Sequence, residues 1–293
     1  MKTSAWFLTA CILPVLSAFG CGSSSVGADT DTGADPGITG DVPGAQDPGP
    51  GDVPLSDVPV ADNPPAGDPA PDAVPQMISC QVLVSEIGPT GAETVMPGVQ
   101  VTLLSDPGGS PTGQSATSDA EGHVTFQVMS DETFGVKLAK SGDLDSYSFG
   151  FSPQDSPADA SILSQAMADN VLTLLGATQD PAKGMASGTV RFGTGSGIGD
   201  PIGCATVQST PSGQVFYFDA SGPRTLADLP STAKAKGDFL VLNVPAGAVA
   251  LTAKVNGTEI ATGAGRVFPG AITFRIVVSS TGAVNPTPAD CAQ

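Results

Sequence analysis

Short runs in which apolar and polar residues alternate fill much of the chain from residue 77 onward. Gly122 to Val128 reads Gly-His-Val-Thr-Phe-Gln-Val, and Phe134 to Leu138 keeps the same two-residue period. Such a period buries one face of an extended segment, and Gly, Pro, Asp or Ser clusters end each run. Many short strands at this spacing predict an all-β chain of β-sandwiches. The expected strands include 79–85, 99–104, 122–128, 133–138, 201–207, 239–244 and 249–254.

The segment from Ala28 to Gln76 cannot contribute to such a core. It holds ten Asp and eleven Pro, with no Lys, Arg, Glu or aromatic residue. Few large apolar side chains, one sign of charge and frequent Pro leave too little buried surface to offset the entropy of ordering. We therefore expect residues 21–76 to form a disordered acidic linker rich in Pro and Gly. Its Asp residues are expected to solvate the chain, because a calcium site needs about six to eight converging oxygens.

The first twenty residues have the composition of an export signal. Lys2 is the only charged residue before Asp29, and an apolar run of fifteen residues extends from Ala5 to Phe19. This run is too short for a membrane-spanning helix of the mature protein. Small residues then lead to Cys21, and the string Leu-Ser-Ala-Phe-Gly-Cys resembles the lipobox of bacterial lipoprotein signals.

The resemblance implies that residues 1–20 are removed and that Cys21 becomes an acylated first residue. Several acyl chains on one residue suffice for stable anchoring, so the membrane is the first expected partner. The residue after Cys21 is not Asp, which in the enterobacterial family favours the outer membrane. An ordinary cleaved secretory peptide and modification of Cys11 are the alternatives.

A weak repeat divides the folded part into two halves. In the first half the tight turn Thr117 to Gly122 precedes a strand, and in the second half Asn243 to Gly247 reads Asn-Val-Pro-Ala-Gly between two strands. These motifs resemble the carboxypeptidase regulatory-like domain, a transthyretin-like β-sandwich. The resemblance is better over about 185–280 than over about 77–152, where an immunoglobulin-like sandwich is the alternative. It implies a structural or adhesive module.

These observations predict a signal peptide, a linker, two tandem β-sandwiches and one helix between them. Ser156 and Pro157 suit the start of that helix, and its apolar stripe is expected to pack across both sandwiches. The stripe consists of Leu163, Met167, Val171 and Leu174. The predicted ranges are 1–20, 21–76, 77–152, 153–184 with a helix over about 157–175, and 185–293.

Few residues suggest chemistry. A net charge of −18, with one His in the chain, argues against nucleic acid as a partner. His123 is expected on the surface of a strand, and Asp119 to Gly122 is expected to form a hairpin turn rather than a calcium loop. The glycine-rich string Gly193 to Gly199 is read as a connection, because Asp200 and a strand follow where a phosphate loop needs a helix. We therefore predict no cofactor and no metal.

Three cysteines remain after the signal and the anchor. Close pairs such as Cys-x-x-Cys are absent, and an exported protein meets an oxidising compartment, so a disulfide is expected rather than a metal site. We favour a pairing of Cys204 with Cys291, because both belong to the second sandwich and the bond would fasten the C-terminal tail. Cys80 is the alternative partner for either of them.

The sequence thus predicts a non-enzymatic envelope lipoprotein that displays β-sandwich modules on a tether. Its role would be surface binding, adhesion or structural support, with a protein or glycan as the partner at the cell surface. The alternative is a carrier or binding protein for a small ligand or glycan, which needs aromatic side chains around a concave site. Tyr217, between Phe216 and Phe218, is the candidate cluster, although we expect it to be strand core.

Overall fold

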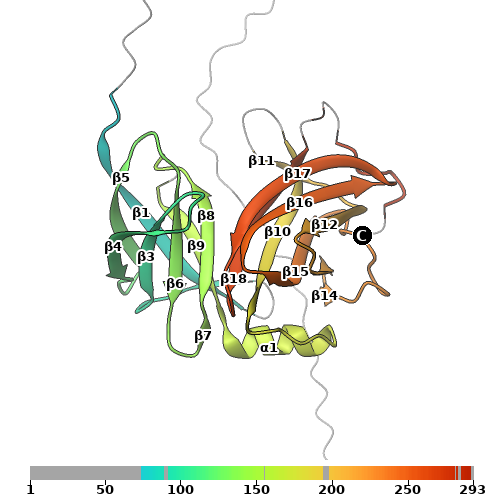
Figure 1. The fold of residues 1–293 in the computed structure, drawn as a ribbon, viewed down its shortest axis with the longest axis horizontal. Helices are drawn as coiled ribbons and strands as arrows, with labels where there is room; N and C mark the ends of the chain where they lie inside the picture. The colour runs from blue at the N-terminus through green and yellow to red at the C-terminus, as the bar shows by residue number, and fades with distance from the viewer. Residues whose placement is uncertain are drawn as a thin grey trace, which may run out of the picture. The chain divides into compact units, whose positions relative to one another are not determined.

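The computed structural model describes residues 74–88, 92–154, 156–193, 198–280, 282 and 285–291. These residues form an all-β structure with one short helix, as predicted (Figure 1). The predicted signal peptide, Cys21 and nearly all of the predicted linker lie outside the described residues.

The first module is a sandwich of two sheets. Strand β1 is the centre of one sheet, with β5 and β2 antiparallel to it along one edge and β9 parallel to it along the other. This sheet contains β1 (Met77–Ile87), β2 (Glu93–Val95), β5 (His123–Met129), β7 (Asp143–Leu144) and β9 (Ala158–Ser164). The facing sheet runs in the order β4 (Pro111–Thr117), β3 (Gln100–Ser105), β6 (Phe134–Ala139) and β8 (Ser146–Phe151). The alternating residues of both sheets form one buried core.

The second module is a larger sandwich whose inner side chains form a second core. One sheet follows the order β14 (Gly222–Arg224), β13 (Gln214–Asp219), β15 (Asp238–Pro245), β10 (Lys183–Gly193) and β18 (Ile272–Ser280), with β11 (Ile198–Pro201) beside β10. The other contains β12 (Ala205–Thr210), β16 (Gly247–Val255) and β17 (Thr258–Val267). The turn between β15 and β16 falls at the predicted Pro-Ala-Gly string.

The predicted strand over 201–207 is wrong in its first half. Residues 202–204 lie between β11 and β12, so the strand begins only at Ala205. Cys204 has a positive φ of 57°, which an extended strand does not allow. At Gly203 an added Cβ would lie 2.4 Å from the Lys234 Cα and 2.8 Å from the Cys291 sulfur, so the close approach of these two segments requires glycine there.

The predicted helix begins eight residues too early. Residues 158–164 form β9, and α1 spans Gln165–Leu174, with the Ser164 hydroxyl accepting a hydrogen bond from the Met167 N–H at 3.3 Å. Ala158 and Ala160 are buried and Asp159 between them is exposed, so this stretch has the two-residue period of a strand. It pairs in parallel with the open edge of β1.

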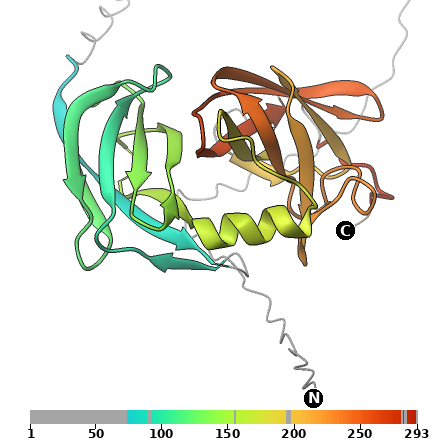
Figure 2. The ribbon, with the colours of Figure 1, turned by 60° about the horizontal axis from the view of Figure 1, so that its bottom comes forward.

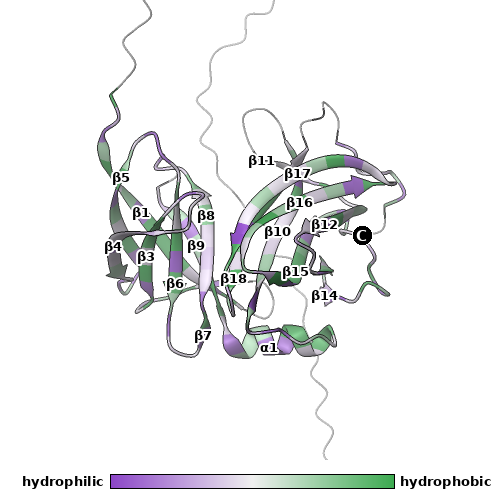
Figure 3. Ribbon diagram, in the orientation of Figure 1, coloured by the Kyte–Doolittle hydropathy of each residue, from purple (hydrophilic) through white to green (hydrophobic). Residues whose placement is uncertain are grey.

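The buried stripe of α1 also differs from the predicted one. Ala168, Leu172 and the C-cap residue Leu175 are buried, whereas Leu174 is 70% exposed. These side chains contact apolar residues of both modules, so the helix packs across the two sandwiches as predicted. Figure 1 shows α1 below both groups of strands, Figure 2 shows it running from one group to the other, and Figure 3 shows hydrophilic and hydrophobic patches alternating along it.

A shared sheet joins the two modules. Strand β8 of the first module pairs in parallel with β18 of the second, with Ser146, Tyr147 and Ser148 opposite Ile272, Thr273 and Phe274. The hydrogen-bonded ladder therefore continues from β4 to β14 within one sheet of thirteen strands. The two sandwiches therefore share one sheet and belong to one compact unit of the chain.

A side-chain amide closes one edge of the first module. The Gln114 Nε2 of β4 donates to the Gln127 carbonyl oxygen at 2.8 Å, and the Gln127 N–H donates to the Gln114 Oε1 at 3.1 Å. The amide thus makes the two hydrogen bonds that a neighbouring strand would make with β5. The backbone N–H and carbonyl of Gln127, on the edge of β5 away from β1, are hydrogen-bonded in this way and are not left open to another strand.

Candidate functional site

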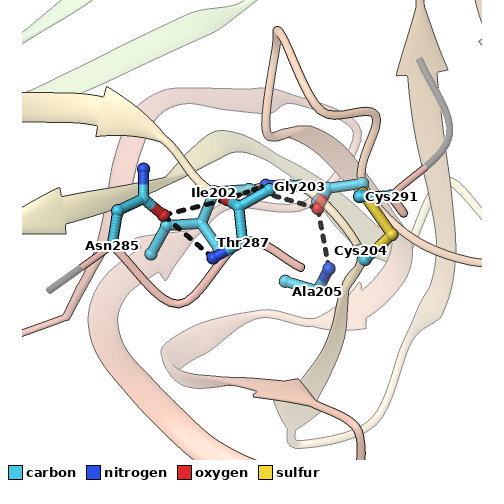
Figure 4. Close-up of a disulfide and its surroundings, with 8 residues drawn as sticks. Ile202, Gly203, Cys204, Ala205, Asn285, Thr287 and Cys291 are labelled. Atoms are coloured by element: carbon cyan, nitrogen blue, oxygen red, sulfur yellow. Dashed lines mark hydrogen bonds between the residues drawn. A yellow bond between two sulfur atoms is a disulfide. The ribbon is translucent and has the colours of Figure 1, made fainter. Parts of the chain in front are cut away.

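A disulfide joins Cys204 and Cys291, the pairing favoured from the sequence (Figure 4). It fastens the C-terminal segment to the connection between β11 and β12. Cys80 takes no part in it and lies fully buried in β1, within the core of the first module. The predicted lipidation residue, Cys21, lies outside the described residues.

Hydrogen bonds hold the C-terminal segment beside the disulfide (Figure 4). The Gly203 N–H donates to the Thr287 Oγ1 at 3.0 Å, and that hydroxyl donates to the Asn285 Oδ1 at 2.9 Å. Beneath them, the buried Thr232 accepts from the Ala205 N–H at 3.0 Å and donates to the Ile202 carbonyl at 2.8 Å. These hydrogen bonds, together with the disulfide, fasten the C-terminal segment to the connection between β11 and β12.

The Thr-Ser-Asp turn of the first module is also structural. The Asp119 Oδ1 accepts from the N–H groups of Glu121 and His123 at 3.1 and 2.7 Å. The Ser118 hydroxyl accepts from the Val99 N–H at 2.9 Å. The turn joins β4 to β5, which belong to facing sheets, so it crosses the sandwich and is not the predicted hairpin turn.

His123 is less exposed than predicted. It is half-buried on β5, opposite Leu83 of β1, and its Nδ1 atom is buried with no hydrogen-bond partner among the described residues. Asp119, four residues before it, has its Oδ1 engaged with the backbone N–H groups of Glu121 and His123, so this carboxylate oxygen fastens the turn.

Tyr217 belongs to the core, as expected. The side chain is 2% exposed, and its hydroxyl oxygen accepts from the Val207 N–H at 2.7 Å. Burial raises the pKa of Tyr217 above its usual value, because the phenolate would lose its hydration. Phe216 of the same strand faces the α1 side of the sheet instead. These aromatic side chains do not line a common site.

A second aromatic group lies at the module junction. Tyr147 of β8 stacks on Phe268, with ring centroids 3.8 Å apart and planes at 10°. The guanidinium of Arg275 lies 4.7 Å from the Phe151 ring centroid and donates to the Asp159 carbonyl at 2.6 Å. Both contacts bring side chains of the second module onto the first, so they reinforce the shared sheet.

Asp143, Asp238 and Lys137 are among the other groups with displaced pKa values. Burial raises the pKa of Asp143, and the nearby Glu86 raises it further. Burial likewise raises the pKa of Asp238, although a hydrogen bond from the Thr189 hydroxyl at 2.8 Å favours the ionised form. The pKa of Lys137 is raised by its hydrogen bond with Asp145. The three residues lie on different strands and do not converge on one reacting position.

Three further features are a possible metal site, the glycine-rich string and a membrane-spanning helix. Within the described ranges, no group of three or more His, Cys, Asp or Glu side chains could hold a metal ion. Strand β11 begins at Ile198, within the glycine-rich string Gly193 to Gly199, and residues 194–197 of that string lie outside the described residues. No helix in the described part of the chain is long and apolar enough to cross a membrane.

Comparison with known proteins adds little to this description. No protein-family model and no curated protein matches the sequence. Among solved structures, the Bacillus anthracis TIE protein is 10% identical over 70% of this chain and 35% of its own, with a TM-score of 0.23. The shaft pilin spaA from Lactobacillus rhamnosus GG is 9% identical over 71% of this chain and 100% of its own, with a TM-score of 0.22.

A third solved structure is similar at the same level. GBS52, the minor pilin of Streptococcus agalactiae, is 12% identical over 73% of this chain and 99% of its own, with a TM-score of 0.21. The chain spans about a third of the length of the Bacillus anthracis protein, at 35%. TM-scores this low, at such identities, establish no shared function.

Proposed function

We propose that this chain is an exported envelope lipoprotein that presents one stiff pair of β-sandwiches for binding or structural support at the cell surface. Acyl chains on Cys21 would hold it to the membrane, with the outer membrane favoured, and residues 21–76 would act as the tether. The observation that carries the proposal is the sheet shared between the modules through β8 and β18.

The junction supports a mechanical role. A flexible pair of modules would be joined by a linker alone, whereas here three independent contacts connect them. Backbone pairing of β8 with β18, the apolar core beneath α1 and the Tyr147–Phe268 stack all cross the boundary. Such a body keeps its two outer surfaces at a fixed distance and orientation, which suits a spacer or a bivalent binding surface.

The sites described above support a non-enzymatic role. The Thr-Ser-Asp turn, the C-terminal segment and the buried tyrosine all direct their polar atoms to backbone groups. We assign the second module to the carboxypeptidase regulatory-like kind on its Asn243 to Gly247 turn, which joins β15 and β16. We propose the second sandwich over 185–293, as from the sequence, and extend the first sandwich from 77–152 to 77–164, because β9 ends at Ser164.

The anchor is tested in a Gram-negative host that expresses the full precursor. Wild type is compared with Cys21→Ala, and Cys11→Ala serves as the matched control within the signal. Intact mass, membrane fractionation and protease treatment of whole cells report acylation, membrane attachment and exposure. We expect wild type and Cys11→Ala to be acylated and membrane-bound, and Cys21→Ala to be soluble.

Two results would contradict the proposal. If Cys21→Ala fractionates with the membrane as wild type does, residues 1–21 do not form a lipoprotein signal. If the wild-type protein is acylated but protected from protease in intact cells, the protein faces the periplasm and the surface role fails.

A further inference from the structure

The strands that begin and end the first module lie side by side. The module begins with β1 at Met77 and ends with β9 at Ser164, which leads directly into α1. These two strands pair in parallel, and five pairs of residues join them between Val82 and Glu86 of β1 (Figure 1). Because parallel strands run in the same direction, Met77 and Ser164 lie at opposite ends of the pair. A pull on the chain at these two ends therefore draws β1 and β9 past each other.

The second module has the same arrangement. Its first strand, β10, begins at Lys183, and its last strand, β18, ends at Ser280. They also pair in parallel, and seven pairs of residues join them between Met185 and Phe192 of β10. Tension between Lys183 and Ser280 would likewise draw two adjacent strands past each other. Both modules thus place the same type of contact between their first and last strands.

The direction of a pull decides how a strand pair breaks. When strands are drawn past each other along their length, all hydrogen bonds between them carry the load together. When strands are pulled apart from one end, the bonds break in sequence, and each bears the full load in its turn. Forced unfolding is governed by the unfolding rate, so the first geometry should withstand the greater force.

Strand β1 is bound along its whole length. Each of its eleven residues has a register partner on β5, β9 or β2. The pairing continues one residue beyond the strand, where the Ser130 N–H donates to the Gln76 carbonyl oxygen at 2.8 Å. The inward side chains of Cys80, Val82 and Val84 are 0% exposed and belong to the core of the first module. Displacement of β1 along its axis would therefore break three sets of hydrogen bonds and open the core at the same time.

We infer that the first module is load-bearing, with the β1–β9 pair as the contact that resists tension along the chain. The β10–β18 pair is the corresponding contact of the second module. In the oxidised protein, a pull on the C-terminal end reaches the second module at Cys204 through the disulfide, so this second contact is loaded from that end only after reduction. The inference goes beyond the proposed display role and does not depend on the anchor. Forces are measured on purified protein and localisation is measured in cells, so either proposal can fail alone.

The test is single-molecule force spectroscopy on residues 21–293 with the substitutions Cys21→Ala and Asp131→Cys. Asp131 is exposed in the turn after β5, and Met129 at the end of β5 pairs with Met77. In one geometry the N- and C-terminal ends are pulled, which loads β1 against β9. In the other, the same protein is pulled between its N-terminal end and position 131, which separates β1 from β5 starting at one end. The variant is its own control, because only the direction of the force differs.

The length of chain released identifies each event. Unfolding of the first module releases residues 77–164, which corresponds to roughly 300 Å of extended chain at about 3.3–3.6 Å per residue. With the disulfide intact, the second module can release little more than residues 183–204, roughly 75 Å, because the bond closes the rest into a loop. The two events are therefore distinguished by their lengths.

We expect the event of roughly 300 Å to need at least about twice the force of the first rupture in the other geometry, at the same pulling speed. Glu132→Cys, at the next exposed position, should give the same ratio, and far-UV circular dichroism establishes that both variants fold. Equal forces in the two geometries, or a lower force between the chain ends, would overturn the inference. After reduction, release of residues 183–280 should add an event of roughly 330 Å at a similarly high force. If that event occurs at the lower force instead, the β10–β18 pair does not bear load.

Discussion

Removal of the disulfide should cost the protein a large part of its stability. Cys204 and Cys291 are separated by 87 residues, so the bond closes most of the second module into one loop. In the chain-entropy model a loop of this length removes about 15 cal/mol/K from the unfolded ensemble, which corresponds to roughly 4–5 kcal/mol at ~25 °C. For a folded part of this size, at about 2–4 °C per kcal/mol, that loss lowers the Tm by about 8–20 °C.

The cleanest perturbation is the double variant Cys204→Ala, Cys291→Ala. Alanine leaves the Gly203 to Thr287 hydrogen bond in place, since it uses a backbone N–H and another side chain. Both proteins are made in a Cys21→Ala background, so that lipidation does not affect the comparison. The assay is urea unfolding followed by far-UV circular dichroism, with and without a reducing agent.

The comparison distinguishes the effect of the disulfide bond from the effect of replacing the two cysteine side chains. Reduced wild type and the double variant should unfold at the same urea concentration, well below oxidised wild type. A difference in unfolding free energy below ~1 kcal/mol between oxidised wild type and the double variant would refute the entropic argument. Cys80→Ala is the control for loss of a buried thiol, and it should leave the sensitivity to reductant unchanged.

Two further predictions concern buried polar groups. Tyr217→Phe leaves the Val207 N–H without its acceptor and should destabilise the protein by about 1–3 kcal/mol, measured by urea unfolding; an unchanged midpoint would contradict the assigned hydrogen bond. Because burial raises the pKa of Asp238 above its usual 3.8, the folded state holds that proton more tightly than the unfolded state. The stability contributed by Asp238 is therefore greatest below pH 3.8 and is lost as the pH rises through the raised pKa. Asp238→Asn should be more stable than wild type at pH 7 and equal to it near ~pH 3; a variant less stable at pH 7 would show that the Thr189 hydrogen bond outweighs burial.

Two kinds of apolar pattern made strands predictable. Residues 122–128 alternate and form β5, which buries one face, whereas 239–244 is an almost continuous apolar run and forms β15, which buries both faces. Residues 146–151 were not predicted as a strand, since β8 buries Ser146 and Ser148, which carry no apolar signal. Serines become buried there because β8 is central, with β6 on one side and β18 on the other.

The predicted start of the helix was also wrong because pairing with a distant strand decides the local structure. Ser156 and Pro157 suit a helix start, but the residues after them pair with β1, 76 positions earlier in the chain. No nearby residue reveals that the edge of β1 is open. The Ser164 cap carries the same kind of signal as Ser156, so the choice between them depended on a distant strand.

The role of Asn243 was not predicted from the sequence, where it is only part of a turn between strands. Its Oδ1 accepts from the Asp180 N–H, 63 positions earlier in the chain, and this contact depends on a bulge in β15. The disulfide was easier to predict, because few cysteines remained and two of them belonged to one module.

The glutamine that closes the edge of β5 has a consequence for solubility in different media. Strand edges are often protected by lysines, whose repulsion weakens in concentrated salt. Gln114 instead makes two neutral hydrogen bonds with the backbone of Gln127, and an amide neither titrates nor is screened by ions. The protection of this edge against pairing with another chain should therefore persist in acidic or saline surroundings, where an edge protected by charge would begin to aggregate.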